Sequence, residues 1–141
     1  MKYKFKLEFP EGMPKGTAQQ KRYNSQRKMY FKDKKLIHLE TAYFKALYPN
    51  RIKEPLTGPT KMTIWFGFDI KEKRRWGTYK TSTPDLDNYA KALIDVMSKE
   101  TIGFFSNDSI IADLRLIKTY SEKAFIWIEI EELDKNFGGV I

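Results

Sequence analysis

Apolar and polar residues alternate along several segments of the chain, and this period of two predicts β-strands that bury one face. The expected strands are residues 1–9, 60–70, 109–120 and 124–133. In the first, apolar residues at odd positions alternate with charged residues, mostly lysine, so its outer face is expected to be basic. Residues 121–123 form a short polar turn, so the last two strands are expected to pair as a hairpin.

Two other segments carry apolar residues at the three- and four-residue spacing of an amphipathic helix. Residues 34–48 form the first, and Asp33 is placed to cap it. Residues 84–98 form the second, with Thr83 as the expected N-cap and Pro84 at the first helical position. The stripe that this second helix should bury consists of Leu86, Ala90, Leu93 and Met97.

These elements follow one another as β-α-β-α-β-β, which predicts a single α/β (α+β) domain over residues 1–141, with helices packed on a mixed sheet. Residues 11–32 are rich in Gly, Pro, Gln and Asn, and we expect a long loop there. Residues 71–80 are expected to form a hairpin tip or a loop. From about residue 134 onward the chain is expected to fray.

Composition limits the chemistry that the chain can perform. The hydrophobic fraction of 41% is enough for a core, and the net charge of +8 suits either a polyanionic partner or a soluble basic surface. Cysteine is absent and His38 is the only histidine, so thiolate and multi-histidine metal sites are excluded. A metal would be held by carboxylates, which favours Mg²⁺, with Mn²⁺ as a substitute. No apolar run approaches the ~20 residues of a membrane span, so we expect no membrane association and a cytoplasmic location.

Basic and aromatic residues are interleaved in two segments, a combination that suits nucleic-acid phosphates and unstacked bases. The candidate DNA contacts are Lys15, Lys21, Arg22, Arg27, Lys28, Lys73, Arg74, Arg75 and Lys80. Trp76 and Tyr79 lie in the second segment, where they could stack on bases or pack against the sheet. The same segments could also be ordinary solvated loops.

An acidic motif stands at the start of the second expected helix. Asp85 and Asp87 are two residues apart, and Asp108 begins a strand where the chain could return to the helix start. Three carboxylates gathered there could hold a divalent cation for phosphodiester hydrolysis. Lys91, one helical turn after Asp87, could stabilise charge on the reacting phosphate. An ordinary structural interpretation also exists, because Asp stabilises helix N-termini and an Asp–Lys pair stabilises a helix.

The residues flanking this motif form a more specific pattern. It comprises Pro84-Asp85-Leu86-Asp87-Asn88, then Lys91-Ala92 and Asp95, then Gly103-Phe104-Phe105 and Asn107-Asp108. This pattern resembles the RusA-like family of Holliday-junction resolvases, which occur in bacteria and their prophages. Family members often have an acidic residue where this chain has Asn107, and Asp108 occupies the matching catalytic position.

The resemblance implies a homodimer that acts on four-way DNA junctions or other branched DNA with Mg²⁺. Asp85, Asp87 and Asp108 would match the catalytic metal-binding acids of the family, and Lys91 its catalytic lysine. The expected reaction is paired, symmetric phosphodiester hydrolysis that leaves 5′-phosphate and 3′-hydroxyl ends, in DNA recombination and repair. Two alternatives remain, a broader branched-DNA nuclease and a non-enzymatic nucleic-acid-binding module. The second gives the three aspartates no role.

Overall fold

The structure is a computed structural model that describes residues 1–16, 21–24, 29–32 and 34–141. Its elements in chain order, with η marking short 3₁₀ helices, are β1 (Lys2–Phe9), β2 (Lys21–Asn24), β3 (Met29–Lys32), α1 (Lys34–Leu47), η1 (Tyr48–Asn50), β4 (Thr60–Asp69), η2 (Lys73–Arg75), α2 (Leu86–Met97), η3 (Asp108–Ile110), β5 (Ile111–Ser121) and β6 (Ala124–Glu132). The α+β class is therefore confirmed. The predicted order of the main elements is confirmed as well, with one short strand pair added. As expected, the tail after Glu132 has neither helix nor strand.

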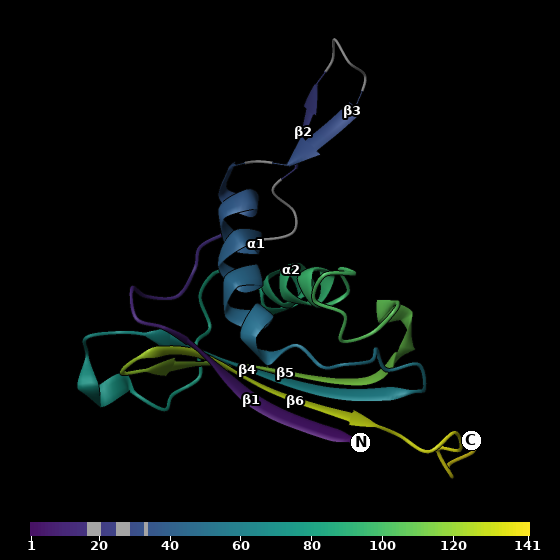
Figure 1. The fold of residues 1–141 in the computed structure, drawn as a ribbon. Helices are drawn as coiled ribbons and strands as arrows, with labels where there is room; N and C mark the ends of the chain where they lie inside the picture. The colour runs from purple at the N-terminus through teal and green to yellow at the C-terminus, as the bar shows by residue number, and fades with distance from the viewer. Residues whose placement is uncertain (17–20, 25–28, 33) are drawn as a thin grey trace.

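Four strands form one mixed sheet in the order β1-β6-β4-β5 (Figure 1). β6 pairs antiparallel with both β1 and β4, whereas β4 and β5 run parallel. The prediction that the last two strands pair as a hairpin is therefore wrong, because β4 lies between β5 and β6 in the sheet. Parallel neighbours need a crossover connection, and α2 supplies it. The acidic motif therefore lies on the connection between two adjacent parallel strands.

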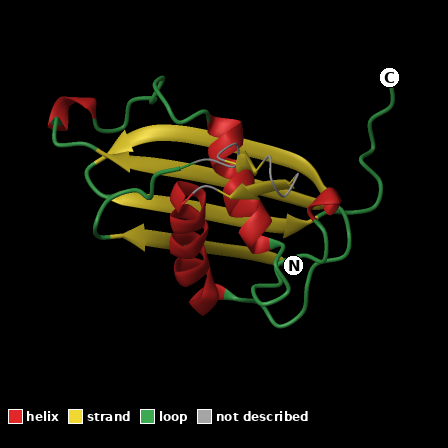
Figure 2. Ribbon diagram, turned by 90° about the horizontal axis from the view of Figure 1, so that it is seen from above, coloured by secondary structure: helices red, strands yellow, loops and turns green. Residues whose placement is uncertain are grey.

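Both helices cover the same face of the sheet (Figure 2). Their apolar stripes pack on the inward side chains of β4 and β6, so the core forms between one helical layer and the sheet. The side chains that this core buries completely include Leu39 and Tyr43 of α1, Leu93 and Met97 of α2, and Ile64 of β4. In the described part of the chain, no helix is both long enough and apolar enough to cross a membrane.

Residues 11–32 are not the continuous loop that we expected. β2 and β3 pair antiparallel, from Lys21 opposite Lys32 to Asn24 opposite Met29. The pair extends away from the sheet, beyond the start of α1 (Figure 1). Gly, Pro and amide residues are frequent in this stretch as a whole, whereas the two paired segments contain tyrosine and phenylalanine, which favour strands. The proposed cap residue Asp33 lies outside the described residues.

The second helix begins later than the sequence suggested. Asp85, and not Thr83, is the N-cap residue, with an extended backbone (φ −61°, ψ 132°). Pro84 lies outside the helix: the first helical hydrogen bond runs from the Tyr89 N–H to the Asp85 carbonyl, and the Pro84 carbonyl accepts from the ammonium group of Lys118 instead. The predicted apolar stripe of this helix is confirmed at Ala90, Leu93 and Met97, which are buried, and Leu86 packs against the same core.

β5 is an edge strand, and it begins after the short helix η3. Thr60 lies opposite Ile111 and Lys61 opposite Asp113, so Ala112 is an extra residue in β5 at a bulge. Beyond the bulge, Met62 aligns with Leu114 and Ile64 with Leu116. Leu114 thus lies on the helix-covered side of the sheet, yet 43% of it is exposed because the sheet ends there.

Candidate active site

The carboxylates of Asp85 and Asp87 stand at the N-terminal end of α2 and are not held by hydrogen bonds there. Asp85 is the N-cap residue, but its side chain makes no capping hydrogen bond. Asp87 does not pair with Lys91, because the Lys91 ammonium lies 3.7 Å from Asp95 instead. Both aspartates are exposed, and neither makes a side-chain hydrogen bond or ion pair within the described residues. The Asp87–Lys91 pair considered from the sequence is therefore absent, whereas Asp87 does lie in the first turn of α2, where the helix dipole favours a carboxylate.

Lys118 of β5 fixes the segment that leads into Asp85, a role that the sequence reading missed. Its ammonium group donates hydrogen bonds to the carbonyl oxygens of Ser82 and Pro84, both at 2.7 Å. Partial burial lowers the pKa of Lys118 and nearby Lys80 lowers it further, while Asp85 opposes the shift. The signal was present in the sequence, because Lys118 continues the alternation of Leu114 and Leu116 at a position where an apolar residue is expected.

Two of the predicted DNA-contact residues gather beside Lys118. Lys80 donates to the Ser82 hydroxyl at 2.7 Å, and its ammonium lies 5.1 Å from the ring centre of Tyr120. Arg75 also lies over the Tyr120 ring, with its guanidinium carbon 4.4 Å from the ring centre. The hydrogen bond with Ser82 lowers the pKa of Tyr120, and Lys80 and Arg75 lower it further. Three cations therefore stand close to the start of α2.

A cleft of about 1020 Å³ opens beside this end of α2. Its lining includes Lys15, Asp69, Lys80, Asp85 and Asn88, so the N-terminal segment contributes one predicted DNA-contact lysine. Asp69 was not singled out from the sequence. Its carboxylate accepts a hydrogen bond from the Met13 backbone N–H at 3.0 Å, which holds the segment after β1 against the end of β4.

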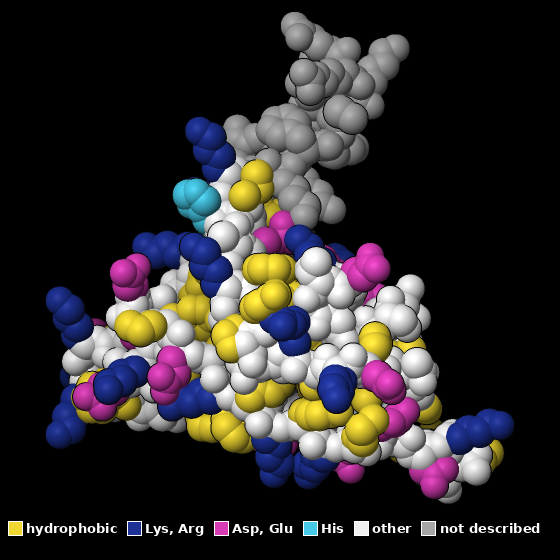
Figure 3. All heavy atoms as spheres, viewed as in Figure 1, with side chains coloured by type: hydrophobic (Ala, Val, Ile, Leu, Met, Phe, Trp, Pro, Cys, Tyr) yellow, Lys and Arg dark blue, Asp and Glu magenta, His cyan; other side chains and the backbone are white. Residues whose placement is uncertain are grey.

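The remaining predicted DNA contacts are distributed as follows. Lys73 and Arg74 lie in or beside η2, where Arg74 and Arg75 both approach Glu72, at 3.5 and 3.8 Å. Residues 71–80, around η2, are called the basic lobe below. Figure 3 shows Lys and Arg side chains around this lobe, mixed with acidic ones. The backbone at Lys21 and Arg22 belongs to β2, whereas Arg27 and Lys28 lie outside the described residues.

The two aromatic residues of this lobe differ. Trp76 is partly buried and donates its indole N–H to the carbonyl of Ile70 at 2.8 Å, so it supports the loop. Tyr79 is 75% exposed. Tyr79 therefore remains available to contact a partner.

Asp108 lies at the opposite end of α2, and the chain does not return to the helix start there as expected. The backbone N–H of Phe104 donates to the carbonyl of Met97, so the segment leading to η3 stays near the helix C-terminus. From Ile111 to Lys118, whose ammonium contacts Pro84, β5 spans roughly 23 Å at about 3.3 Å per residue. Accordingly, the described residues contain no group of three acidic or histidine side chains that could hold a metal ion.

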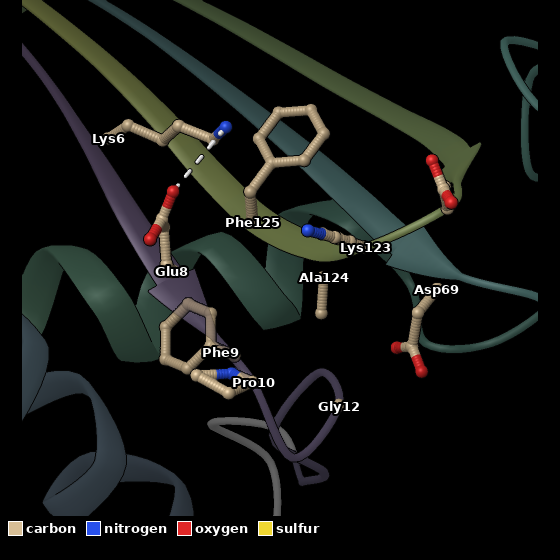
Figure 4. A pocket seen from close by; sticks show the side chains of 10 residues that line it. Lys6, Glu8, Phe9, Pro10, Gly12, Asp69, Lys123, Ala124 and Phe125 are labelled. Carbon is tan, nitrogen blue, oxygen red and sulfur yellow. Dashed lines mark ion pairs between the residues drawn. The ribbon is translucent and has the colours of Figure 1, made fainter.

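A second pocket, of about 340 Å³, lies at the ends of β1 and β6 (Figure 4). It is lined by Lys6, Glu8, Phe125 and Asp69 among others, with an ion pair of 3.7 Å between Lys6 and Glu8. None of the predicted catalytic residues lines it. Its position therefore gives no reason to move the candidate site away from α2.

Comparison with known proteins settles the family. Residues 11–131 match the family model described as Endodeoxyribonuclease RusA. The chain is also 39% identical over 136 residues to a protein of Lactococcus phage r1t named "Crossover junction endodeoxyribonuclease rusA", covering 94% of this chain and 100% of that protein. The chain belongs to the RusA family. The expected family is thereby confirmed, and so is the enzyme class, because RusA proteins are nucleases that hydrolyse phosphodiester bonds.

The part of the chain that matches the family contains the candidate site. The match spans β2 to β6 and includes both ends of α2. The acidic motif, the cations around Tyr120 and the cleft thus all belong to the part of the chain that is RusA-like. For a nuclease, exposed carboxylates next to basic residues are a reasonable site for a metal and a phosphate.

Proposed function

We propose that this RusA-family chain is a Mg²⁺-dependent endodeoxyribonuclease that resolves four-way DNA junctions by paired, symmetric cuts in DNA recombination and repair. The observation that carries the proposal is the pair Asp85 and Asp87, whose carboxylates make no hydrogen bond or ion pair with the described residues and which stands beside three cations. The relative in Lactococcus phage r1t is named for a crossover junction substrate, which supports the same substrate here.

The donor chemistry at this end of α2 fits a hard divalent cation, because carboxylate oxygens are the ligands that Mg²⁺ and Mn²⁺ prefer. Such a cation would offset the charge of the carboxylates and of the bound phosphate, and would favour deprotonation of water. In the proposed reaction, the water oxygen bonds to phosphorus and the bond from phosphorus to the 3′ oxygen breaks. The 3′ oxygen gains a proton, so the products are 5′-phosphate and 3′-hydroxyl ends.

The position of Asp108 adds a requirement to this proposal. Ligands of one Mg²⁺ lie about 2.1 Å from it, so Asp108 cannot join Asp85 and Asp87 across the length of α2, which is about 18 Å for 12 residues. A two-fold dimer that places the C-terminal end of one α2 near the N-terminal end of the other would bring the three carboxylates together. We therefore propose that Asp85 and Asp87 act with Asp108 of a second copy.

The activity is tested with a labelled synthetic four-way junction, incubated with and without Mg²⁺ and resolved on a sequencing gel. Paired symmetric cuts that require Mg²⁺ support the proposal. Equal cleavage of flaps, forks and junctions in competition indicates the broader branched-DNA nuclease. Binding without cleavage at any Mg²⁺ concentration contradicts the proposal.

The shared site is tested by mixing two inactive variants, Asp85→Asn/Asp87→Asn and Asp108→Asn. If the site is shared, each mixed dimer contains one intact set of three aspartates, so about one quarter of the wild-type sites should return as junction nicking. If each chain forms its own site, both sites of the mixed dimer are damaged and no activity returns. Differently tagged chains, purified together, confirm that mixed dimers are present.

A further inference from the structure

The outer edge of β5 is uncovered over a defined length. At the end of the strand, residues 77–80 run along this edge: Gly77 and Lys80 donate to the carbonyls of Tyr120 and Lys118, and the Tyr120 N–H donates to Thr78. From Ile111 to Ile117, β4 is the partner of β5 among the described residues, and it lies on the other side. An unpaired strand edge is a template for a further strand.

The direction of the backbone groups along this edge can be deduced. N–H and C=O groups of successive residues in a strand point alternately to its two sides. Because Lys118 and Tyr120 bond outward to residues 77–80, Leu114 and Leu116 also present their N–H and C=O groups outward. Leu114 is the midpoint of the uncovered stretch, so a strand of the same sequence can pair there antiparallel about a two-fold axis.

We propose that the uncovered edge of β5, residues 111–117, is the dimer interface, and that its occupant is β5 of a second copy of this chain. In this register, Leu114 exchanges both backbone hydrogen bonds with Leu114 of the second copy. Asp113 then lies directly opposite Arg115 of the second copy, and Arg115 opposite Asp113. The sequence around Leu114 is thus complementary in charge to itself when read in the antiparallel direction.

The side chains near this edge suit an interface. Leu114 is 43% exposed although it lies on the helix-covered side, and Asp113 and Arg115 are exposed on the other side. Pairing would cover the two Leu114 side chains at the axis. Tyr79, 75% exposed and next to the covered end of β5, would meet η3 of the second copy and enlarge the buried apolar area.

This arrangement has a consequence for the site. Antiparallel pairing brings the start of β5 in one copy to the end of β5 in the other. Asp108 would therefore approach the Lys118 end of the second copy, where the loop before Asp85 is held. The β5 edge would thus provide the contact surface of the dimer. Only the need for a dimer rests on the proposed function.

The absence of cysteine from the chain allows a direct test. Opposed residues that exchange hydrogen bonds have Cα atoms about 5.5 Å apart, a separation that a disulfide can bridge. Leu114→Cys should therefore form a disulfide-linked dimer within minutes of mild oxidation at micromolar protein. Lys53→Cys, in an exposed loop, should remain monomeric on the same non-reducing gel. Absence of linkage at position 114 in a protein that sediments as a dimer would overturn the inference.

Charge exchange provides a second test that does not depend on oxidation. Asp113→Arg and Arg115→Asp should each weaken dimerisation by about tenfold or more in sedimentation, because like charges then oppose one another. The double exchange should restore the dissociation constant to within about threefold of wild type. Failure of the double variant to recover, with its thermal stability intact, contradicts the register. If the wild-type protein sediments as a monomer, the proposed interface is excluded. Sedimentation involves no DNA cleavage, so a protein that dimerises but does not cut junctions contradicts the proposed function and not the interface.

Discussion

The two ends of α2 differ in how their polar groups are satisfied. At the C-terminal end, the backbone N–H groups of Ser98, Lys99 and Phe104 bond to carbonyls in the last turn of the helix, and Phe104 and Phe105 are fully buried. At the N-terminal end, Asp85 occupies the cap position without capping, next to an open cleft. One end is a closed structural unit, whereas the other keeps charged groups unsatisfied. In an enzyme, such unsatisfied groups are where substrate and cofactor are expected to bind.

The difference also fits the proposed site, in which Asp85 and Asp87 act with Asp108 of a second copy. Asp108 follows the closed end, so its position is set by the buried aromatics that precede it. Asp85 and Asp87 lie at the open end, where Lys118 holds the preceding loop. Each end therefore presents acidic groups from a rigid support, and in the proposed dimer a second copy would bring them together.

The largest expected effect is the loss of DNA cleavage, whichever end of α2 carries the substituted aspartate. Asp85→Asn, Asp87→Asn and Asp108→Asn should each reduce the cleavage rate by about a thousandfold, near 4 kcal/mol of activation free energy, because each removes a proposed metal ligand. Junction affinity should stay within about threefold of wild type, since the basic surface is unchanged. Single-turnover cleavage and gel-shift titration measure the two quantities. Near-normal cleavage by any one variant removes that residue from the site.

Stability should separate the two ends. Phe105→Ala should lower the free energy of unfolding by about 3–5 kcal/mol, because it leaves a cavity at the closed end of α2. Asp85→Asn should change it by less than about 0.5 kcal/mol, because the native carboxylate makes no capping bond. Urea denaturation of both variants gives these values. Strong destabilisation by Asp85→Asn would show that this carboxylate has a structural role after all.

Lys91 should affect turnover more than binding. Lys91→Ala is expected to slow cleavage by about a hundredfold with little change in junction affinity, because its charge is proposed to act at the reacting phosphate. Asp95→Asn is the matched control, since it breaks the 3.7 Å pair with Lys91 but retains the ammonium group. If the two variants slow cleavage equally, the ion pair and not the lysine charge accounts for the effect.

Substitution of Lys118 should affect only the N-terminal, open end of α2. Lys118→Met removes the hydrogen bonds to Ser82 and Pro84, so we expect about a tenfold slower reaction and a higher Mg²⁺ concentration for half-maximal rate. Lys123→Met, in the turn after β5, controls for the loss of one positive charge. A lower melting temperature with an unchanged Mg²⁺ midpoint would mean that Lys118 only stabilises the fold.

The smallest effect is expected for the basic lobe that flanks the open end. Arg74→Gln/Arg75→Gln should weaken junction binding by about fivefold at moderate salt and flatten the salt dependence by up to about two ions, if both contact phosphates. Lys2→Gln/Lys135→Gln removes the same charge from segments outside this lobe and should have less effect. Equal effects from the two double variants would show that only net charge matters.

Much of this architecture follows from local sequence patterns. The alternation in β1 and β4 and the helical spacing in α2 identify these elements because each buries one face against the core. The start of α2 was misplaced because Thr83 and Pro84 carry helix-start signals, whereas in the structure the Pro84 carbonyl bonds to Lys118, a residue distant in sequence, and the helix begins after Asp85. The pair β2 and β3 was missed because its strands are only four residues long each.

The candidate site was more difficult to predict than the fold. Asp85, Asp87 and Lys91 could be named because their spacing in sequence is also their spacing on the helix. The position of Asp108 depends on the path of residues 98–107, whose turns are fixed by long-range burial of Phe104 and Phe105. Lys118 was missed because its role depends on a contact with residues more than thirty positions earlier.

The interior position of β6 in the sheet limits the order in which the strands can pair during synthesis. β1 is made first, but its neighbour in the sheet is the last strand, so the two ends of the chain must meet before the sheet is continuous. Such distant pairing delays folding, because a long loop has to close first. While the chain is being synthesised, β4 and β5 can pair, but β1 has no partner until residues 124–132 have left the ribosome. A chain that lacks this segment would therefore leave β1 without its partner strand and one edge of β4 unpaired.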